Sequence, residues 1–158
     1  ISLLCSTFAN VLNQPQELIP RLVKGALLHD IGKSKIDNKI LLKPGKLTNE
    51  EWEIIKTHPI LGVELLKETN INDEIITQMV KYHHEKFDGN GYPERLKNNE
   101  IPFAAQIIAI CDVFDALTSQ RAYKTAVGSF PAFKIMLNEM DGSFNKELLT
   151  KFINIFKE

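Results

Sequence analysis

IITQMVKYHHEKFDGNGYPERLKNNEIPFAAQIIAICDVFDAL, residues 75–117, is the stretch that does most to define the fold. Apolar residues recur at helical spacing over residues 75–82 and lead directly to His83 and His84. The spacing is then lost in residues 85–101, which contain several glycine, proline and asparagine residues. Loops of this length are usually functional in compact domains, so the histidine pair is predicted to close a helix beside a functional loop.

A second helix follows this loop, beginning after Pro102 and continuing over residues 103–117. It is apolar on nearly all sides, yet it carries Asp112 and Asp115. Carboxylates on a buried helix need partners, because an unpaired buried charge is costly.

Upstream, two further histidines lie at predicted helix boundaries. The apolar spacing of residues 19–31 predicts a helix with His29 and Asp30 in its last turn. His58 precedes Pro59, which cannot continue a helix but is well placed at the start of the next. His58 is therefore expected at a helix junction, where a side chain can point sideways into a cleft.

Capping residues place the remaining helices. Thr48 and Glu51 have the spacing of a capping box, Asn72 or Asp73 caps the helix that leads to the histidine pair, and Asn145 caps the last helix. Residues 36–46, by contrast, are predicted to be a loop, and helices are expected over residues 129–140 and 146–156. With no strand-like alternation, the sequence predicts an all-α fold.

The composition is that of one globular domain over residues 1–158, with 44% hydrophobic and 25% charged residues. The net charge of −1 gives no overall positive field for binding DNA or anionic lipid. Cys5 and Cys111 form no CxxC pair, which favours a reducing compartment, with the cytoplasm as the default. No apolar stretch approaches the roughly 20 residues of a membrane helix. Helical spacing begins at Ile1 without a capping residue, so the first part of this helix is expected upstream.

These histidines and carboxylates form a ligand set without sulfur, which suits Fe, Mn, Co, Ni or Zn, and a carboxylate beside a histidine can bridge two ions. The candidate ligands are His29, Asp30, His58, His83, His84 and Asp112, with Asp30 as the natural bridge. Taken singly, each has an ordinary structural interpretation, such as a helix-terminal histidine or an aspartate paired within the core. Their combination needs a shared reason, and metal ions provide one.

Four ordered motifs resemble those of the HD-GYP family, the branch of the HD phosphohydrolase superfamily that hydrolyses cyclic di-GMP. They are His29-Asp30-Ile31-Gly32-Lys33, Leu42-Lys43-Pro44-Gly45-Lys46-Leu47-Thr48, His83-His84-Glu85 followed by Asp88-Gly89 and Gly91-Tyr92-Pro93, and Ile101-Pro102 followed by Ala109 to Leu117, Thr118-Ser119, Arg121 and Tyr123-Lys124. The resemblance covers nearly the whole chain and implies an HD-domain helical bundle with a metal centre at converging helix ends.

The resemblance also implies that the six candidate ligands bind two or three divalent transition-metal ions, with Fe or Mn favoured. Lys33 would lie near the scissile phosphate and stabilise its charge, although a lysine at a helix end can instead serve the helix dipole. Asp115, three residues after Asp112, would orient a ligand or the attacking water, or else pair with a neighbouring base.

Substrate contacts are implied at the Gly91-Tyr92-Pro93 turn and after the apolar helix. Gly91 and Tyr92 would touch the nucleotide, and Arg121 and Lys124 would hold phosphate or guanine edges, although paired surface bases are common. The turn is also a candidate contact for diguanylate-cyclase domains, and a homodimer is left open.

The expected function is hydrolysis of cyclic di-GMP to linear pGpG, with further cleavage to GMP left open. Two alternatives remain: a receptor or interaction module that binds without turnover, and an HD hydrolase that acts on another nucleotide. The first has some support, because family members carry a further histidine whose matching position would lie about one helical turn before Ile1.

Overall fold

The computed structural model describes residues 1–120 and 126–157, and every regular element in these ranges is helical. The elements are α1 (Ser2–Val11), α2 (Ile19–Leu28), η1 (Ile31–Lys35), α3 (Asn38–Leu41), α4 (Asn49–Ile55), α5 (His58–Glu68), α6 (Glu74–Tyr82), η2 (Asn98–Glu100), α7 (Phe103–Thr118), α8 (Ser129–Lys134), η3 (Ile135–Glu139) and α9 (Lys146–Asn154). The predicted all-α class is confirmed. No helix in these ranges is both long enough and apolar enough to cross a membrane.

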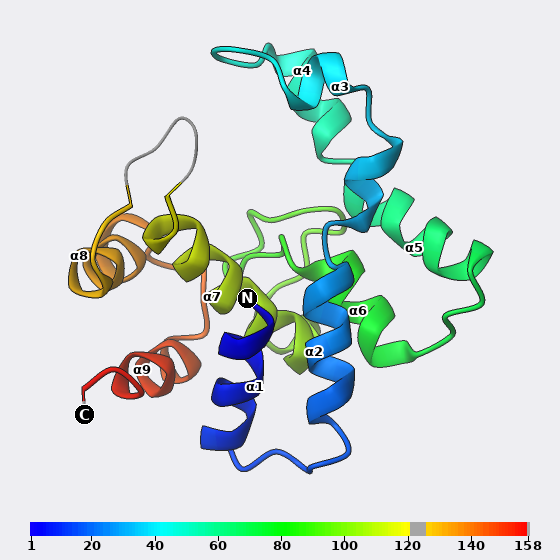
Figure 1. Cartoon of the computed structure of the whole chain (residues 1–158). Coiled ribbons are helices and arrows are strands. Elements are labelled where there is room, and N and C mark those ends of the chain that lie inside the picture. The colour runs from blue at the N-terminus through cyan, green and yellow to red at the C-terminus, as the bar shows by residue number, and fades with distance from the viewer. Residues whose placement is uncertain (121–125, 158) are drawn as a thin grey trace.

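Helix α7 is the centre of the bundle, because nine of its 16 residues are buried. Helices α1, α6, α8 and α9 pack against it, and α2 lies beside both α1 and α6 (Figure 1). Aromatic rings fill the space between α1, α7, α8 and α9: Phe8 meets Phe152 at a centroid distance of 5.1 Å, and Phe114 stacks on Phe133 at 5.1 Å. This packing holds Asp112 of α7 close to the end of α2.

Helices α3 and α4 stand apart from this core. Figure 1 shows them at one end of the molecule, connected to the bundle through η1 and α5. None of the α4 residues is buried. The connection is tight where η1 crosses α5, since a Cβ on Gly32 would overlap the carbonyl oxygen of His58 and lie 2.5 Å from the backbone nitrogen of Gly62. Only glycine allows this approach, which places the end of α2 beside the start of α5.

The predicted caps are present. Glu51 N donates to Thr48 Oγ1 (3.2 Å) and Thr48 N donates to Glu51 Oε2 (2.7 Å), which completes the capping box of α4. Asp73, rather than Asn72, caps α6, and Asn145 caps α9. Local hydrogen-bonding chemistry therefore sets these helix starts.

Several predicted boundaries differ from the structure. The expected loop at residues 36–46 contains α3, because the Asp37 side chain accepts a hydrogen bond from Lys39 N (2.8 Å) and caps a short turn. Helix α2 ends at Leu28, and the chain turns at Asp30 into η1. The helix expected over residues 129–140 is divided into α8 and a π-helical turn, η3.

Replacing Asp73 with alanine should lower the free energy of unfolding by about 1–2 kcal/mol, because the side chain caps α6 through Ile75 N and Ile76 N. Asp73 also pairs with Arg21 through contacts of 2.7 and 2.9 Å, which holds the pKa of Asp73 below its usual range. The lowered pKa of Asp73 contributes stability that is complete above the pKa that this carboxyl has in the unfolded chain. This stability is lost as the pH falls through the pKa of Asp73 in the folded state.

Denaturant unfolding at neutral and acidic pH would check this prediction. The difference between parent and Asp73→Ala should shrink on acidification, and Asp73→Asn should keep most of the cap while losing the ion pair with Arg21. Equal stability of the parent and Asp73→Ala at neutral pH would contradict the assigned role.

Candidate metal centre

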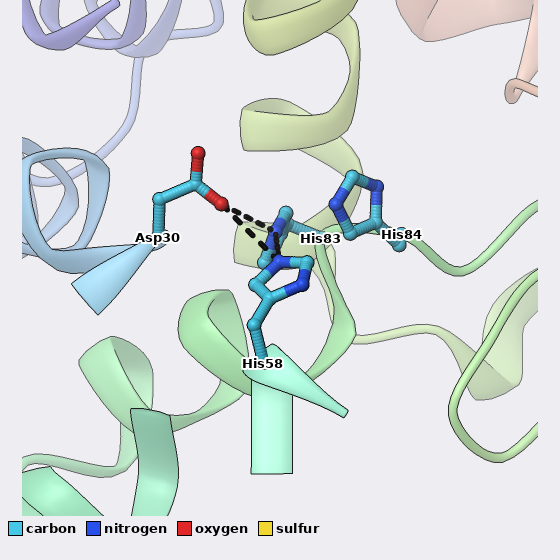
Figure 2. A group of neighbouring side chains, drawn as sticks. All are labelled: Asp30, His58, His83 and His84. Carbon is cyan, nitrogen blue, oxygen red and sulfur yellow. Dashed lines mark hydrogen bonds and ion pairs between the residues drawn. The ribbon is translucent and has the colours of Figure 1, made fainter. Parts of the chain in front are cut away.

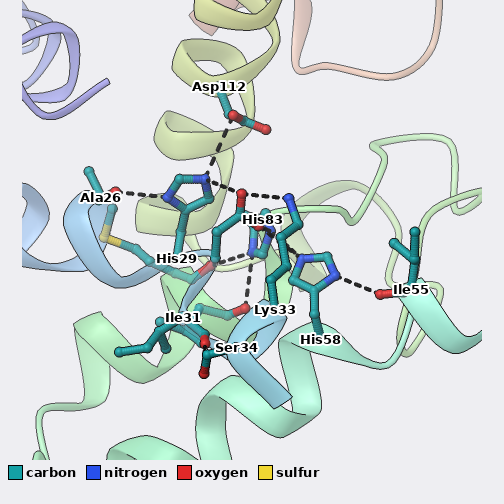
Figure 3. A network of polar contacts seen from close by, with 12 residues as sticks. Ala26, His29, Ile31, Lys33, Ser34, Ile55, His58, His83 and Asp112 are labelled. Atoms are coloured by element: carbon teal, nitrogen blue, oxygen red, sulfur yellow. Dashed lines mark hydrogen bonds and ion pairs between the residues drawn. The ribbon is translucent and has the colours of Figure 1, made fainter. Parts of the chain in front are cut away.

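His29 and Asp30 lie where α2 ends. His29 Nδ1 donates to the carbonyl oxygen of Ala26 (2.8 Å), because a carbonyl can only accept, and this leaves the Nε2 lone pair free. His29 Nε2 lies 3.4 Å from Asp30 Oδ2 and 3.7 Å from Asp112 Oδ1 (Figure 3). Three potential ligands, two from the end of α2 and one from the middle of α7, thus lie close together.

His58 and His83 repeat this pattern from two other helices. Nδ1 of His58, the first residue of α5, donates to Ile55 O (2.7 Å), and Nδ1 of His83, just after α6, donates to Val80 O (3.0 Å). Their Nε2 atoms lie 3.1 Å apart, and Asp30 Oδ1 lies 3.2 Å from His58 Nε2 and 3.7 Å from His83 Nε2 (Figure 2). Two imidazole lone pairs that face each other need either a proton or a metal ion between them.

His84 completes a compact group with Asp30, His58 and His83, in which one potential ligand atom from each residue lies within 4.8 Å of the others. The His84 ring stacks on the Tyr92 ring at a centroid distance of 4.7 Å and an angle of 27°. Burial, together with the neighbouring His83 and His58, lowers the pKa of His84 to about 2. The imidazole is therefore neutral, the form that binds metal.

Two other ionisable groups, His83 and Asp30, are also shifted towards the forms that ligate metals. Burial lowers the pKa of His83. Burial opposes ionisation of Asp30, but contacts with His29, His58 and His83 outweigh it and hold the pKa of this carboxyl well below its usual range. For His29, the lowering by burial is outweighed by Asp30, so its pKa is raised. The Asp30 carboxylate is consequently the anionic centre of the cluster.

The side chains fit divalent metal ions. His29 Nε2 and Asp30 Oδ1 are buried and, among the described residues, have no hydrogen-bond partner, although Asp30 Oδ1 is close to two imidazole nitrogens. Buried polar atoms rarely stay unsatisfied, and a cation held by imidazole and carboxylate would satisfy both of these. The structure brings together all six predicted ligands, which are His29, Asp30, His58, His83, His84 and Asp112.

The other predicted site residues differ in position. Lys33 Nζ contacts Asp30 Oδ2 at 2.6 Å, so Lys33 lies at the edge of the cluster. Asp115 is not among the carboxylates in ion-pair contact with the described histidines. Arg121 and Lys124 fall outside the described residues, so their predicted nucleotide contacts stay predictions.

Glu85 has a structural role that the sequence analysis missed. This buried carboxylate accepts hydrogen bonds from Glu94 N (2.7 Å) and Leu96 N (3.0 Å), so it fastens the loop onto the end of α6. Gly91 allows close contact there, since a Cβ would lie 2.5 Å from Glu85 Cα, and Tyr92 N donates to His84 O (3.2 Å). The sequence feature that could have indicated this role is an acidic residue directly after the histidine pair that ends an apolar helix.

Comparisons with known proteins agree with this geometry. The profile of the HD domain family matches residues 1–148. A cyclic di-GMP phosphodiesterase of Thermotoga maritima is 36% identical over 156 residues, which are 98% of this chain and 42% of that protein. The 3'3'-cGAMP-specific phosphodiesterase 2 of Vibrio cholerae is 39% identical over 125 residues, which are 78% of this chain and 24% of that protein. The chain thus spans less than half of each relative.

Among solved structures, Bd1817, an HDG"Y"P protein from Bdellovibrio bacteriovorus, has the same fold, with a TM-score of 0.80 and 22% identity over 99% of this chain and 50% of that one. The family profile covers nearly the whole sequence, and the four motifs and the six candidate ligands lie within the residues that it matches. The chain therefore belongs to the HD domain family.

Proposed function

We propose that this domain is the catalytic part of a metal-dependent phosphodiesterase that hydrolyses cyclic di-GMP to linear pGpG. The observation that carries the proposal is the set of imidazole Nε2 atoms that converge on Asp30 while their Nδ1 atoms are bound to backbone carbonyls. Similarity to relatives such as the cyclic di-GMP phosphodiesterase of Thermotoga maritima supports the substrate. Subsequent cleavage of pGpG to GMP belongs to the same proposal.

In this proposal, His29, Asp30, His58, His83, His84 and Asp112 hold two or three divalent ions, with Fe or Mn favoured by the nitrogen and oxygen ligands. When bound, these ions supply Lewis-acid polarisation of the phosphoryl oxygens and lower the pKa of water. Lys33, beside Asp30, adds positive charge where negative charge grows on the phosphate. Asp115 orients water from the next turn of α7.

Tyr92 and Gly91 contact the nucleotide in this proposal, while Arg121 and Lys124 hold phosphate or guanine edges. Contact of the Gly91-Tyr92-Pro93 turn with diguanylate-cyclase domains, homodimer formation and a cytoplasmic location are parts of the proposal that need separate tests.

The protein loaded anaerobically with Fe²⁺ or Mn²⁺ should bind at least two ions per chain and convert cyclic di-GMP to pGpG, as followed by nucleotide chromatography. Chelation should abolish turnover, because the cluster supplies ligands rather than a nucleophile. The comparison substrate in this assay is 3'3'-cGAMP, because one relative is a 3'3'-cGAMP-specific phosphodiesterase.

Cleavage of 3'3'-cGAMP alone would show that the substrate assignment is wrong. Binding of cyclic di-GMP by fully loaded protein without any turnover would instead support the receptor alternative. Fewer than one ion per chain after reconstitution would contradict the metal centre itself.

A further inference from the structure

A cavity of about 870 Å³ opens beside the metal centre. Of the six candidate metal ligands, only His84 lines it. Its walls include Trp52 and Lys56 from the α4 region and Lys86, Tyr92 and Arg95 from the long loop. His84 lies at the side of the cluster away from Asp30 (Figure 2), so the cavity extends from the metal centre towards α4. Its volume is in the range of small-molecule sites.

Trp52 is placed for a role other than core packing. No residue of α4 is buried, and 47% of the surface of Trp52 is exposed. A large aromatic side chain on such a helix contributes little to the core, and Trp52 lines the cavity. Every nucleobase has a π-face, so a base can stack on an exposed aromatic ring of this kind.

The cavity wall is also positively charged. Lys56 is paired with Glu53 (2.5 Å), while Lys86 and Arg95 form no ion pair within the described part of the chain. Arg95 has a left-handed backbone conformation, with φ at 57°, which is unfavourable for a residue with a side chain. The hydrogen bonds from Glu94 N and Leu96 N to Glu85 hold the backbone on both sides of Arg95 and maintain this conformation. Such unpaired cations suit an anionic ligand.

We infer that this cavity is a base site in which Trp52 stacks on the nucleobase of the substrate nucleotide that lies away from the metal centre, with Lys86 and Arg95 facing its phosphate. The inference rests on the proposed function, and it adds a specificity-determining contact from α4. It commits to a nucleotide rather than a protein partner because the site is concave, bears cations and shares His84 and Tyr92 with the metal centre.

Trp52 is the only tryptophan of the chain, so its fluorescence reports on the site directly. Titration of the metal-loaded protein with GMP should quench this fluorescence saturably, and UMP, whose smaller base stacks more weakly, should quench it less. This readout does not depend on turnover, so it tests the base site even if cyclic di-GMP is not hydrolysed. GMP that binds by calorimetry but leaves the fluorescence unchanged would overturn the inference, as would the absence of any GMP binding.

Trp52→Ala should weaken binding of a non-hydrolysable cyclic di-GMP analogue by between about fivefold and 150-fold, the usual contribution of one base stacked on an aromatic ring. Trp52→Phe should restore part of the loss, because it keeps a flat ring, and metal content should be equal in all variants. Phe130→Ala is the matched control, since Phe130 is a 77% exposed aromatic residue outside the cavity.

Parent-like affinity of Trp52→Ala would overturn the inference. So would loss of binding to a diguanylate-cyclase domain with nucleotide binding intact, which would assign the α4 surface to protein docking instead. Because α4 has no buried residue, Trp52→Ala should fold, and thermal unfolding of the metal-loaded variants would verify this.

Discussion

Asp30→Ala should lower the affinity for divalent metal by more than about a hundredfold, because substitution of partners that only orient the ligands already costs about 10–100-fold. Asp30 is the carboxylate on which His29, His58 and His83 converge, at distances of 3.2–3.7 Å. Its removal takes away one of the two carboxylates of the cluster, the one that contacts three imidazoles. Elemental analysis after reconstitution and the rate of cyclic di-GMP hydrolysis would measure the loss.

Thermal unfolding supplies a readout of Asp30→Ala that is independent of activity. A metal at a hundredfold excess over its dissociation constant stabilises a protein by about 2.7 kcal/mol, so the parent should gain stability on metal addition and the variant should gain much less. Asp30→Asn keeps the size of the side chain without its charge. Asp141→Asn is the control, because it makes the same change at an exposed carboxylate that pairs with Lys146. A parent-like metal content in both Asp30 variants would show that Asp30 is not a ligand.

The sequence predicted which candidate ligands the structure brings together, because most of them lie at helix ends, where local signals are strong. Pro59 marks the start of α5 at His58, and the apolar spacing of α6 runs to His83. The HD-GYP motifs then identified these helix ends as one site. Their meeting in space depends on packing between helices distant in sequence, such as η1 against α5 at Gly32, which spacing alone does not specify.

Other features could not be predicted because they depend on contacts between distant segments. The position of Trp52 in the sequence of α4 is equally consistent with a side chain that faces the core and with one that faces a cavity. Only the position of the long loop in the folded protein distinguishes these two possibilities. Glu85 could be seen within its motif, but its two acceptor contacts to the backbone around Arg95 result from the folding of the loop. Helix α3 was missed for a different, local reason: its four residues are too few to show a helical spacing of apolar residues, although Asp37 caps it.

Gly32→Ala should destabilise the protein by about 3 kcal/mol or more and weaken metal binding at the same time. The added Cβ would overlap the carbonyl oxygen of His58 and approach Gly62 N, and backbone atoms cannot move aside as a flexible side chain can. Insertion of one methyl group into a tight contact usually costs about 1–3 kcal/mol, and rigid backbone on both sides puts this site at the upper end. Because His58 is itself a candidate ligand, separation of η1 from α5 should also move its imidazole away from Asp30.

Gly128→Ala is the matched control for this prediction. A Cβ at Gly128 would have Pro131 Cδ as its nearest neighbour, at an ordinary contact distance of 3.7 Å, and its φ of −65° suits alanine. Its free energy of unfolding should therefore change by less than about 1 kcal/mol. Denaturant unfolding of metal-free and metal-loaded protein separates the two effects of Gly32→Ala: the packing loss appears in both states, whereas the displacement of His58 reduces the gain on metal addition. If Gly32→Ala unfolded like Gly128→Ala, the close approach of η1 and α5 would not be what holds His58 against Asp30.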